Sequence, residues 1–403
     1  MIPYGEALDL LLGGLTPLCA ERVGLDQALG RVLAEDIVAP GPQPAFSYSA
    51  MDGYALSAAP PPDQGPWSLP VRGTSRAGDV PDLLPSGSAW RIFTGAPLPQ
   101  GADAVVAQED VQVHEGGILV RERPAAGQHV RARGVDLAAG AVALVRGSRL
   151  TAGRVGLAAR LDRPYLRVTR QPVLTILGTG DELRLPGEPG GPGSIAESNG
   201  FVLAALGRQA GAVVRVAPAV ADDLAQTRLA IGRAIGGSDV VATVGGASVG
   251  DRDLVRPALA ELGVLLDFWR VAIKPGKPTA AGRIQGTRIL CLPGNPASAA
   301  VTFVLFAMPL LRSLQGDREP LPRRAAMRVL GCYRRQPERT EREQYLGARL
   351  ELRGDELCAR LLPSQASGAT TWFAEAEALA VLGADRPAVE EGERLPVMRV
   401  GDA

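Results

Sequence analysis

Two glycine-rich loops that carry carboxylates are the first sign of chemistry in this sequence. Residues 178–182 read Gly-Thr-Gly-Asp-Glu after an apolar run, and residues 245–253 repeat the arrangement after a second run. Glycine lets backbone N–H groups approach a ligand closely, while the acids project beside it. One such loop is weak support for a site, because tight turns also use glycine. Two of them, each ending in acids after a strand, favour a ligand site.

Lys274 and Lys277 form the second feature, in the sequence Lys-Pro-Gly-Lys-Pro. They are the only lysines in the chain, and every other cation is an arginine. Since arginine serves wherever only charge is needed, two lysines three positions apart indicate a place that needs a compact ammonium group. On a turn stiffened by proline they suit an oxyanion or a phosphate. The alternative is that both lysines survive by chance on a surface loop.

A third loop, Leu-Pro-Gly-Asn-Pro-Ala-Ser at residues 292–298, is placed to open a helix. The first N–H groups of a helix favour an anion, and proline suits the first helical position. Carboxylates, ammonium groups and backbone N–H groups placed to bind an anion together indicate a magnesium-assisted reaction at a phosphate. Asp52, in Ser-Ala-Met-Asp-Gly-Tyr-Ala, belongs either to such a site or to an ordinary turn.

The composition argues against several other chemistries. Lys plus Arg and Asp plus Glu number 43 each, so any anion site is local and no global field recruits nucleic acid or membrane. Two histidines and four scattered cysteines argue against a histidine triad, a zinc site and a disulfide framework. The N-terminus lacks a secretory signal, so we expect a cytoplasmic protein. The most apolar run, residues 299–311, is shorter than a membrane span and predicts a buried helix.

The pattern along the chain predicts a multidomain α/β plus β protein. The first stretch indicates helices over residues 2–15 and 25–34, and β-prone runs follow at 90–94, 104–108 and 118–122. We expect four domains. They are a discontinuous N-terminal irregular and helical domain (residues 1–44 and 135–170), an inserted β-rich domain (45–134), a central α/β domain (171–316) and a C-terminal β-barrel-like domain (317–403).

The central domain alternates apolar strands, glycine loops and helices. The predicted strands cover residues 173–177, 213–216, 240–244, 265–269 and 288–291, and the predicted helices cover 200–209, 222–235, 253–262 and 297–314. This alternation predicts a three-layer domain with a mainly parallel sheet that helices cover on both faces. Ligands of such folds bind at the carboxyl ends of the strands, where the glycine loops lie.

Seven motifs occur in an order that resembles one protein family. They are Ser-Ala-Met-Asp-Gly-Tyr-Ala, Thr-Gly-Ala-x-Leu-Pro-x-Gly-Ala-Asp-Ala-Val-Val, Arg-x-x-Gly-x-Asp, Thr-Gly-Asp-Glu-Leu, Gly-Gly-x-Ser-Val-Gly-Asp, Lys-Pro-Gly-Lys-Pro and Leu-Pro-Gly-Asn-Pro-x-Ser. In these motifs the chain resembles the molybdopterin molybdenumtransferases, the MoeA family, which is also found as the E domain of gephyrin. The match runs essentially from end to end.

The resemblance implies a homodimer of elongated four-domain subunits, with a central domain similar to molybdopterin adenylyltransferases. It implies that the protein inserts molybdate into adenylylated molybdopterin with Mg²⁺ and releases AMP, forming molybdenum cofactor. The expected partners are these two substrates, a second copy of the chain, a molybdopterin adenylyltransferase and proteins of cofactor maturation. No nucleic acid or membrane is expected.

The resemblance also carries over site residues, motif by motif. The residues expected to be catalytic are Asp52, Asp136, Glu182, Asp222, Asp223, Asp253, Lys274 and Lys277, with one of Asp222 and Asp223 matching the family's acid. The expected magnesium ligands are Glu182, Asp253 and Asp222. The expected substrate-binding residues are Thr94, Gly178, Thr179, Gly180, Asp181, Gly245, Gly246, Ser248, Gly250, Pro293, Gly294, Asn295, Pro296, Ser298, Arg342 and Ser367.

Arg342 and Ser367 lie in the last domain and are expected to hold molybdate, reaching the cleft across subunits. The sequence departs from the family at two places. Ser47-Tyr48 replaces an acidic-polar pair before the first motif. The family's Arg-x-Glu-aromatic motif reads Arg-Glu-Gln-Tyr at 342–345, with Gly347 where arginine is common. The second departure bears directly on the oxyanion contacts of the last domain.

Three other functions compete with this one. A molybdopterin adenylyltransferase would consume ATP, but it leaves the first and last domains unexplained. A non-catalytic scaffold that binds molybdopterin or a partner peptide would not need to keep the acids and both lysines. A store of molybdate or tungstate would bind no adenylate. The sequence leaves open the preferred metal, the dimer geometry, and which acids bind Mg²⁺ and which act as bases.

Overall fold

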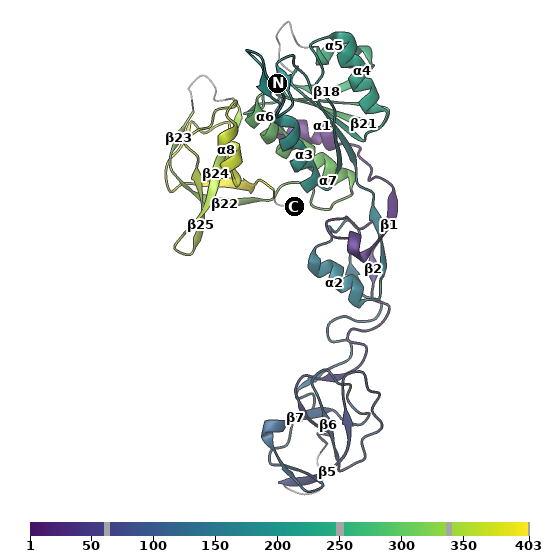
Figure 1. The fold of residues 1–403 in the computed structure, drawn as a ribbon. Coiled ribbons are helices and arrows are strands. Elements are labelled where there is room, and N and C mark those ends of the chain that lie inside the picture. The colour runs from purple at the N-terminus through teal and green to yellow at the C-terminus, as the bar shows by residue number, and fades with distance from the viewer. Residues whose placement is uncertain (60–64, 247–253, 336–340, 402–403) are drawn as a thin grey trace. The chain divides into compact units, whose positions relative to one another are not determined.

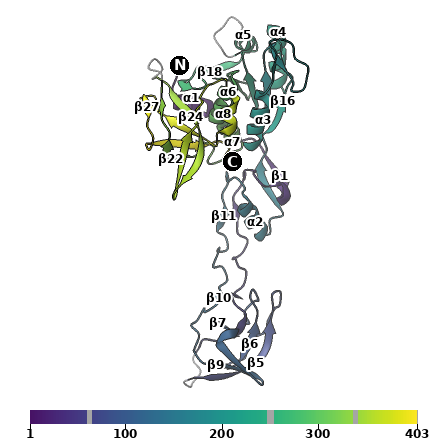
Figure 2. The ribbon, with the colours of Figure 1, turned by 60° about the vertical axis from the view of Figure 1, so that its left-hand side comes forward.

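The computed structural model describes residues 1–59, 65–246, 254–335 and 341–401. The chain divides into two compact units. Unit 1 comprises Met1–Glu35, Arg146–Val155 and Pro164–Ala403, and unit 2 comprises Asp36–Val145 and Gly156–Arg163. The four domain boundaries drawn from the sequence stay predictions. Figures 1 and 2 show the helices and strands of both units.

A six-stranded sheet forms the centre of unit 1. Its order is β16 (Val213–Val216), β13 (Val173–Gly178), β17 (Val240–Val244), β21 (Thr287–Leu292), β20 (Ala280–Ile284) and β18 (Leu265–Trp269). The first four strands are parallel, whereas β20 is antiparallel to both of its neighbours. Every residue of β17 and β21 is buried, because helices cover both faces, and these strands therefore read as continuous apolar runs.

Helices pack on both faces of this sheet (Figure 1). On one face, α4 (Leu224–Ile235) and α5 (Val255–Glu261) bury Ile231 and Leu259 against the strands. On the other face lie α3 (Asn199–Gln209) and the N-terminal helix α1 (Tyr4–Leu12). The predicted three-layer α/β domain with a mainly parallel sheet is therefore confirmed. Strands 213–216, 240–244 and 265–269 occur with the predicted bounds.

The apolar helix has nearly the bounds 297–314 that the sequence predicted. It runs over residues 296–314 as α6 (Pro296–Thr302), a π-helical turn (Phe303–Ala307) and α7 (Met308–Leu314). Pro309 cannot donate to the preceding turn, and the π-helical turn lies where that bond would be missing. By length and composition this run of 19 residues could cross a membrane, yet 94% of its apolar 18-residue window is buried inside the protein. It is the core helix that the sequence predicted.

The helix predicted over residues 25–34 is wrong. A single 3₁₀ turn spans Leu25–Gln27, and Gly30 then adopts a φ of 75° that ends any helix. Val32 and Leu33 instead form β-bridges to Arg149 and Val168. Nearby, β1 (Ala20–Gly24) pairs antiparallel with β12 (Tyr165–Thr169). Pairing with residues more than a hundred positions away has overridden the local apolar spacing.

The last part of unit 1 is a closed β-barrel (Figure 2). Its strands are β24 (Glu343–Arg353), β25 (Glu356–Leu361), β22 (Arg324–Leu330), β28 (Arg394–Arg399) and β26 (Ala378–Leu382), and β26 pairs again with β24. Val329, Leu346 and Val397 pack inside it. The short strand β19 (Ile273–Lys274) joins β24 in parallel, which ties the lysine loop to the barrel. Helix α8 (Thr370–Glu375) and the pair β23 (Tyr333–Arg334) and β27 (Ala388–Val389) complete this part.

Unit 2 is built on a second six-stranded sheet. Its order is β7 (Ala104–Ala107), β4 (Gly53–Leu56), β6 (Ala89–Ile92), β5 (Trp67–Ser75), β9 (Gly117–Val120) and β8 (Val111–His114). Its remaining strands are β2 (Ile37–Val38), β3 (Tyr48–Ser49), β10 (Val130–Arg131) and β11 (Val142–Leu144), and helix α2 (Ala152–Arg160) begins in unit 1 and ends in unit 2. The predicted β-rich character is confirmed.

Candidate functional site

The carboxyl ends of three neighbouring strands bring three predicted loops together. Gly178 of β13 is in register with Val244 of β17, which is in register with Leu292 of β21. The loops that follow are therefore adjacent, and hydrogen bonds join them. The N–H of Thr179 donates to the C=O of Val244 at 3.1 Å, and the N–H of Gly245 donates to the C=O of Leu292 at 3.2 Å.

A cavity of about 710 Å³ opens over these loops. Of the predicted residues, eleven line it: Gly178, Thr179, Gly180, Glu182, Asp222, Gly245, Gly246, Pro293, Gly294, Asn295 and Pro296. All of its lining residues belong to unit 1. This size and this place, at the ends of parallel strands, are those of a small-molecule site.

Gly245 and Gly246 must be glycine for this arrangement. Their φ angles are 92° and 61°, where a side chain is strained. A Cβ atom on Gly245 would lie 2.9 Å from the carbonyl oxygen of Thr179, and one on Gly246 would lie 2.6 Å from Cγ2 of Val255. The two glycines therefore let the loop turn tightly between its neighbours and present backbone to the cavity.

The structure separates the adjacent acids Asp222 and Asp223. Asp222 lines the cavity, and its backbone N–H donates to Oδ1 of Asp181 at 3.0 Å. Asp223 is the N-cap of α4, where its Oδ1 accepts from the N–H of Gln226 at 2.8 Å. The sequence left open which acid belongs to the site. The geometry favours Asp222, because the carboxylate of Asp223 is engaged at the start of the helix.

Glu182 and Asp222 are the two predicted metal ligands that the structure describes, and both line the cavity. Across residues 1–59, 65–246, 254–335 and 341–401, no group of three or more His, Cys, Asp or Glu residues could hold a metal ion. Mg²⁺ is usually held by one or two carboxylates together with substrate phosphates, so this donor set fits Mg²⁺ bound with a phosphate ligand. The predicted residues Asp253, Ser248 and Gly250 lie outside the described residues.

Sequence reasoning missed one wall of the cavity. It is formed by the start of α3 and the small parallel pair β14 (Leu183–Arg184) and β15 (Ile195–Ala196). The side-chain amide of Asn199 donates to the C=O of Gly294 at 2.8 Å, and a Glu197 oxygen accepts from the N–H of Gly200 at 2.7 Å. The sequence Glu-Ser-Asn before an apolar helix is a helix-start signal that could have identified this wall.

Ser298 and Ser367 lie differently from what the sequence indicated. Ser298 is 4% exposed inside α6 and does not line the cavity. Ser367 reaches the site within its own chain, because its hydroxyl accepts from the Asn295 amide at 3.5 Å and the next residue, Gly368, lines the cavity. Within one chain the barrel packs against the central domain, so its loop lies beside the 293–296 loop. The expectation that Ser367 reaches the cleft across subunits stays a prediction.

The two lysines face different surroundings. Lys277 is exposed, next to the cavity-lining residue Pro278. Lys274 is half-buried in β19, and its Nζ donates to the hydroxyl of Tyr333 at 3.4 Å, on the barrel side. Arg342 lies just before β24, and its C=O accepts from the Arg335 guanidinium at 2.9 Å. Lys274 and Arg342 therefore belong to the barrel side of the site, outside the lining of the cavity.

Unit 2 holds the remaining predicted residues. The backbone N–H and the hydroxyl of Thr94 donate to Oδ1 of Asp52 at 2.7 and 2.8 Å. These bonds, the backbone one first, hold the pKa of the exposed Asp52 carboxyl below its usual 3.8. Asp136 is exposed and faces Arg160, with 3.7 Å between Oδ2 and the guanidinium.

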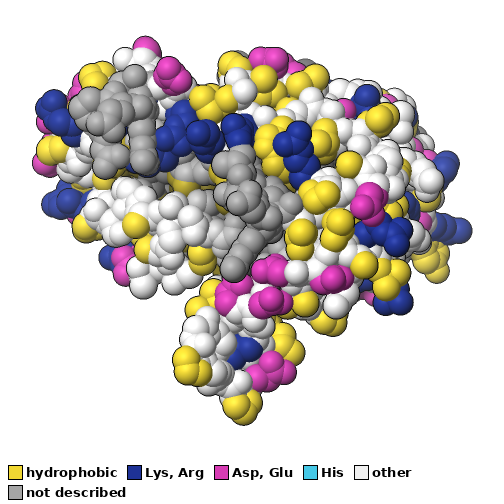
Figure 3. Space-filling view, turned by 90° about the horizontal axis from the view of Figure 1, so that it is seen from above, with side chains coloured by type: hydrophobic (Ala, Val, Ile, Leu, Met, Phe, Trp, Pro, Cys, Tyr) yellow, Lys and Arg dark blue, Asp and Glu magenta, His cyan; other side chains and the backbone are white. Residues whose placement is uncertain are grey.

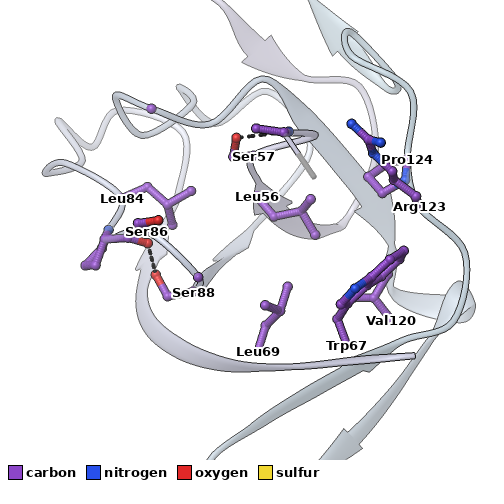
Figure 4. Close-up of a pocket in the computed structure, with 14 residues that line it drawn as sticks. Leu56, Ser57, Trp67, Leu69, Leu84, Ser86, Ser88, Val120, Arg123 and Pro124 are labelled. Carbon is purple, nitrogen blue, oxygen red and sulfur yellow. Dashed lines mark hydrogen bonds between the residues drawn. The ribbon is translucent and has the colours of Figure 1, made fainter. Parts of the chain in front are cut away.

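Unit 2 also contains a smaller cavity of about 360 Å³ (Figure 4). Apolar side chains, among them Leu56, Leu69 and Trp67, form its floor, and Arg123 lies at one end. Both Nε and one terminal nitrogen of Arg123 already donate to the C=O of Ala58. Among the described residues no Asp or Glu lines this cavity, and neither does any predicted site residue, so the strand-end cavity is the candidate site.

The fold and the site define a class: a multidomain α/β protein that binds its ligand at the ends of parallel strands, beside a C-terminal β-barrel. Over 318 residues the chain is 40% identical to "Molybdopterin molybdenumtransferase 2" of Mycobacterium tuberculosis, and this alignment covers 76% of the chain and 78% of that protein. The chain therefore belongs to the molybdopterin molybdenumtransferase family, the MoeA family.

Further comparisons agree with this assignment. Family models match in order: the MoeA N-terminal region (domain I and II) over residues 2–161, a probable molybdopterin binding domain over 175–313 and the MoeA C-terminal region (domain IV) over 332–400. The Haemophilus influenzae molybdopterin molybdenumtransferase is 39% identical over 322 residues, covering 79% of each chain. The crystal structure of a MoeA protein from Pyrococcus horikoshii superposes with a TM-score of 0.80 at 31% identity and 99% coverage of both chains.

Proposed function

We propose that this protein inserts molybdate into adenylylated molybdopterin and releases AMP. The observation that carries the proposal is the strand-end cavity, which combines closely approachable backbone with the carboxylates of Glu182 and Asp222. Its relatives of 40% and 39% identity bear the name molybdopterin molybdenumtransferase. An adenylate with its phosphates suits the glycine loops, because N–H groups and helix starts favour anions.

The chemistry divides between the two sides of the site. The two dithiolene thiols of the pterin bind molybdenum through their sulfurs and give their two protons to one oxo ligand of molybdate, which leaves as one water. Water then cleaves the phosphoanhydride that joins the pterin phosphate to AMP, so AMP is the leaving group. The glycine loops and the 293–296 loop hold the adenylate, while Lys274, Lys277, Arg342 and Ser367 offer positive charge and N–H or O–H donors to molybdate.

Glu182, Asp222 and Asp253 would hold Mg²⁺ in this proposal. A bound Mg²⁺ would offset the charge of the substrate phosphates. Of these acids, the two that the structure describes line the same cavity, on loops that follow different strands. Their separation along the chain favours a ligand-binding role over a local one, since neither is needed to cap a helix or to close a turn.

We also propose that the protein works as a homodimer in the cytoplasm. Asp52 and Thr94 form a hydrogen-bonded pair at the surface of unit 2, so the carboxylate is accessible to a ligand or to a second chain. Sedimentation of the purified protein at working concentration measures its oligomeric state directly. A fully active monomer would contradict the homodimer and leave the proposed reaction intact.

AMP release from purified adenylylated molybdopterin, measured with and without molybdate, tests the function. We expect release that depends on molybdate and on Mg²⁺. Consumption of ATP without molybdate would instead identify an adenylyltransferase. Binding of the adenylate with no AMP release under any condition would identify a scaffold, and molybdate binding without any affinity for the adenylate would identify a store.

A further inference from the structure

Gln344 is a buried amide that has no hydrogen-bond partner in the described part of the chain. The residue is 1% exposed, and neither its Oε1 nor its Nε2 has a hydrogen-bond partner among the residues that the structure describes. Gln315, equally buried at 1%, shows the usual arrangement, because its Nε2 donates to the C=O groups of Ala210 and Leu311 at 2.7 and 2.9 Å. A buried amide without a partner is unfavourable, so Gln344 indicates a place where something else binds.

The strand that carries Gln344 shows where its side chain points. Side chains alternate between the two faces of β24. Tyr345 packs into the core of the central domain, whereas Leu346 packs inside the barrel. Gln344 therefore shares the barrel-facing side with Leu346. Its neighbour across the sheet is Lys274, because the parallel pair β19 and β24 sets Lys274 opposite Gln344. Opposite residues of a pair point to the same face, so the two side chains lie together.

The ammonium group of Lys274 also has N–H donors beyond the one that bonds to Tyr333. Its Nζ donates to the hydroxyl of Tyr333 at 3.4 Å, and Tyr333 packs against the barrel core. An ammonium group carries three N–H donors. No carboxylate forms an ion pair with Lys274 within residues 1–59, 65–246, 254–335 and 341–401. The charge is thus available to an anion.

A second cation adds to this charge. Arg335 is 3% exposed, and one of its terminal nitrogens donates to the C=O of Leu382, the residue opposite Gln344 on β26. Another donates to the C=O of Arg342. Two cations, Lys274 and Arg335, therefore lie around Gln344 although the whole chain has no net charge, and the carboxylate of Asp385 also acts on Arg335. Figure 3 shows one face of the molecule, on which Lys and Arg side chains gather near the upper middle.

We propose that Gln344 is a further residue of the molybdate site, whose side-chain amide donates to an oxygen of the anion held by Lys274. This inference rests on the proposed function and adds a specificity-determining residue to it. An amide is neutral and can donate an N–H to an anion, whereas an ionised carboxylate can only accept a hydrogen bond. The family motif has an acid at this point in the sequence, so the donor from Gln344 is a feature of this chain.

Equilibrium dialysis of molybdate against the full-length protein, without pterin, tests the proposal. Gln344→Met keeps the size and removes the donor, so we expect molybdate to bind about ten- to a hundred-fold more weakly, as for the loss of one charge-assisted hydrogen bond. The melting temperature should not fall, because the amide has no partner to lose. The matched control, Gln315→Met, should show the reverse: unchanged molybdate affinity and a lower melting temperature, since it loses two hydrogen bonds.

A second variant keeps the test decisive if Gln344→Met does not fold. Gln344→Glu should fold by pairing with Lys274 and should also weaken molybdate binding at neutral pH. Wild-type affinity in either folded variant would overturn the proposal, as would a wild-type protein that binds no molybdate. A wild-type protein that binds molybdate through Gln344 but releases no AMP would overturn the proposed function and leave this inference standing.

Discussion

The hydroxyl and the backbone N–H of Thr94 both donate to Oδ1 of Asp52, at 2.8 and 2.7 Å. The two residues are 42 positions apart, and the contact keeps an exposed carboxylate in a fixed orientation with a pKa below 3.8. A folded-state pKa below the unfolded value contributes stability that is present above pH 3.8 and is lost as the pH falls through the lowered pKa.

We predict that Thr94→Val raises the pKa of Asp52 toward its usual value without reaching it. The substitution removes the hydroxyl donor and keeps the stronger contribution, the backbone N–H. Titration of the carboxyl ¹³C resonance by NMR measures the change. Thr74→Val, at an exposed threonine on β5, is the control and should leave the Asp52 pKa where it was. An unchanged Asp52 pKa in Thr94→Val would mean that the hydroxyl bond is absent in solution.

Substitutions of the adjacent acids Asp222 and Asp223 should have opposite effects on turnover and on stability. Asp223→Ala removes the N-cap of α4 and should cost about 1 kcal/mol of unfolding free energy, with AMP release little changed. Asp222→Asn should abolish most AMP release with little effect on stability, because this acid lines the cavity and caps no helix. Denaturant unfolding and AMP release on both variants decide the assignment. The reverse pattern would return the catalytic role to Asp223.

Glu182→Gln should abolish most turnover without unfolding the protein, because Glu182 is exposed to the cavity and its charge serves no packing. We expect the same of Asp253→Asn, at the acid outside the described residues. Glu188→Gln is the matched control: this exposed acid accepts a hydrogen bond from the N–H of Leu185 and does not line the cavity. Normal AMP release from Glu182→Gln at saturating Mg²⁺ would show that this acid is not required.

Lys274→Arg and Lys277→Arg should each impair molybdate-dependent turnover although the charge is kept. A guanidinium is broader and flatter than an ammonium, and Lys274 is half-buried between β24 and Tyr333. The loss of one charge-assisted contact should weaken the apparent molybdate affinity about ten- to a hundred-fold. Titration of molybdate against AMP release compares the variants with the wild type. Overlapping curves would mean that the lysines supply charge alone.

Trp372→Phe should raise the molybdate KM about two- to ten-fold with a smaller change in kcat. The Trp372 indole N–H donates to the C=O of Ala366 at 2.8 Å and so fixes the segment that brings Ser367 to Asn295. Gly347 leaves room for the ring, since a Cβ atom there would lie 2.4 Å from it. Steady-state kinetics with molybdate as the varied substrate measure the split. A fall of about two- to ten-fold in kcat with an unchanged KM would contradict a positioning role.

The sequence by itself determined the parts of the fold that rest on local patterns. The strands at 213–216, 240–244 and 265–269 are short apolar runs with glycine, proline or a charged residue close to their ends, and runs of this length favour strands over helices. The loops of the cavity could be predicted for the same reason. Glycines at strand ends permit the close approach of backbone that a phosphate site requires, and Gly245 and Gly246 indeed adopt positive φ angles.

Only the tertiary structure decided which side chains meet. The segment 25–34 has helical apolar spacing, yet it forms β-bridges to residues 149 and 168 because those partners bury it better. Asp222 and Asp223 look equivalent in sequence and differ because α4 begins at Leu224, which makes Asp223 the N-cap and leaves Asp222 to line the cavity. No local pattern in the sequence distinguishes Gln344 from other strand residues. Only the pairing of β19 with β24 shows that it lies opposite Lys274. Contacts between distant residues depend on how whole elements pack, and no local pattern encodes that packing.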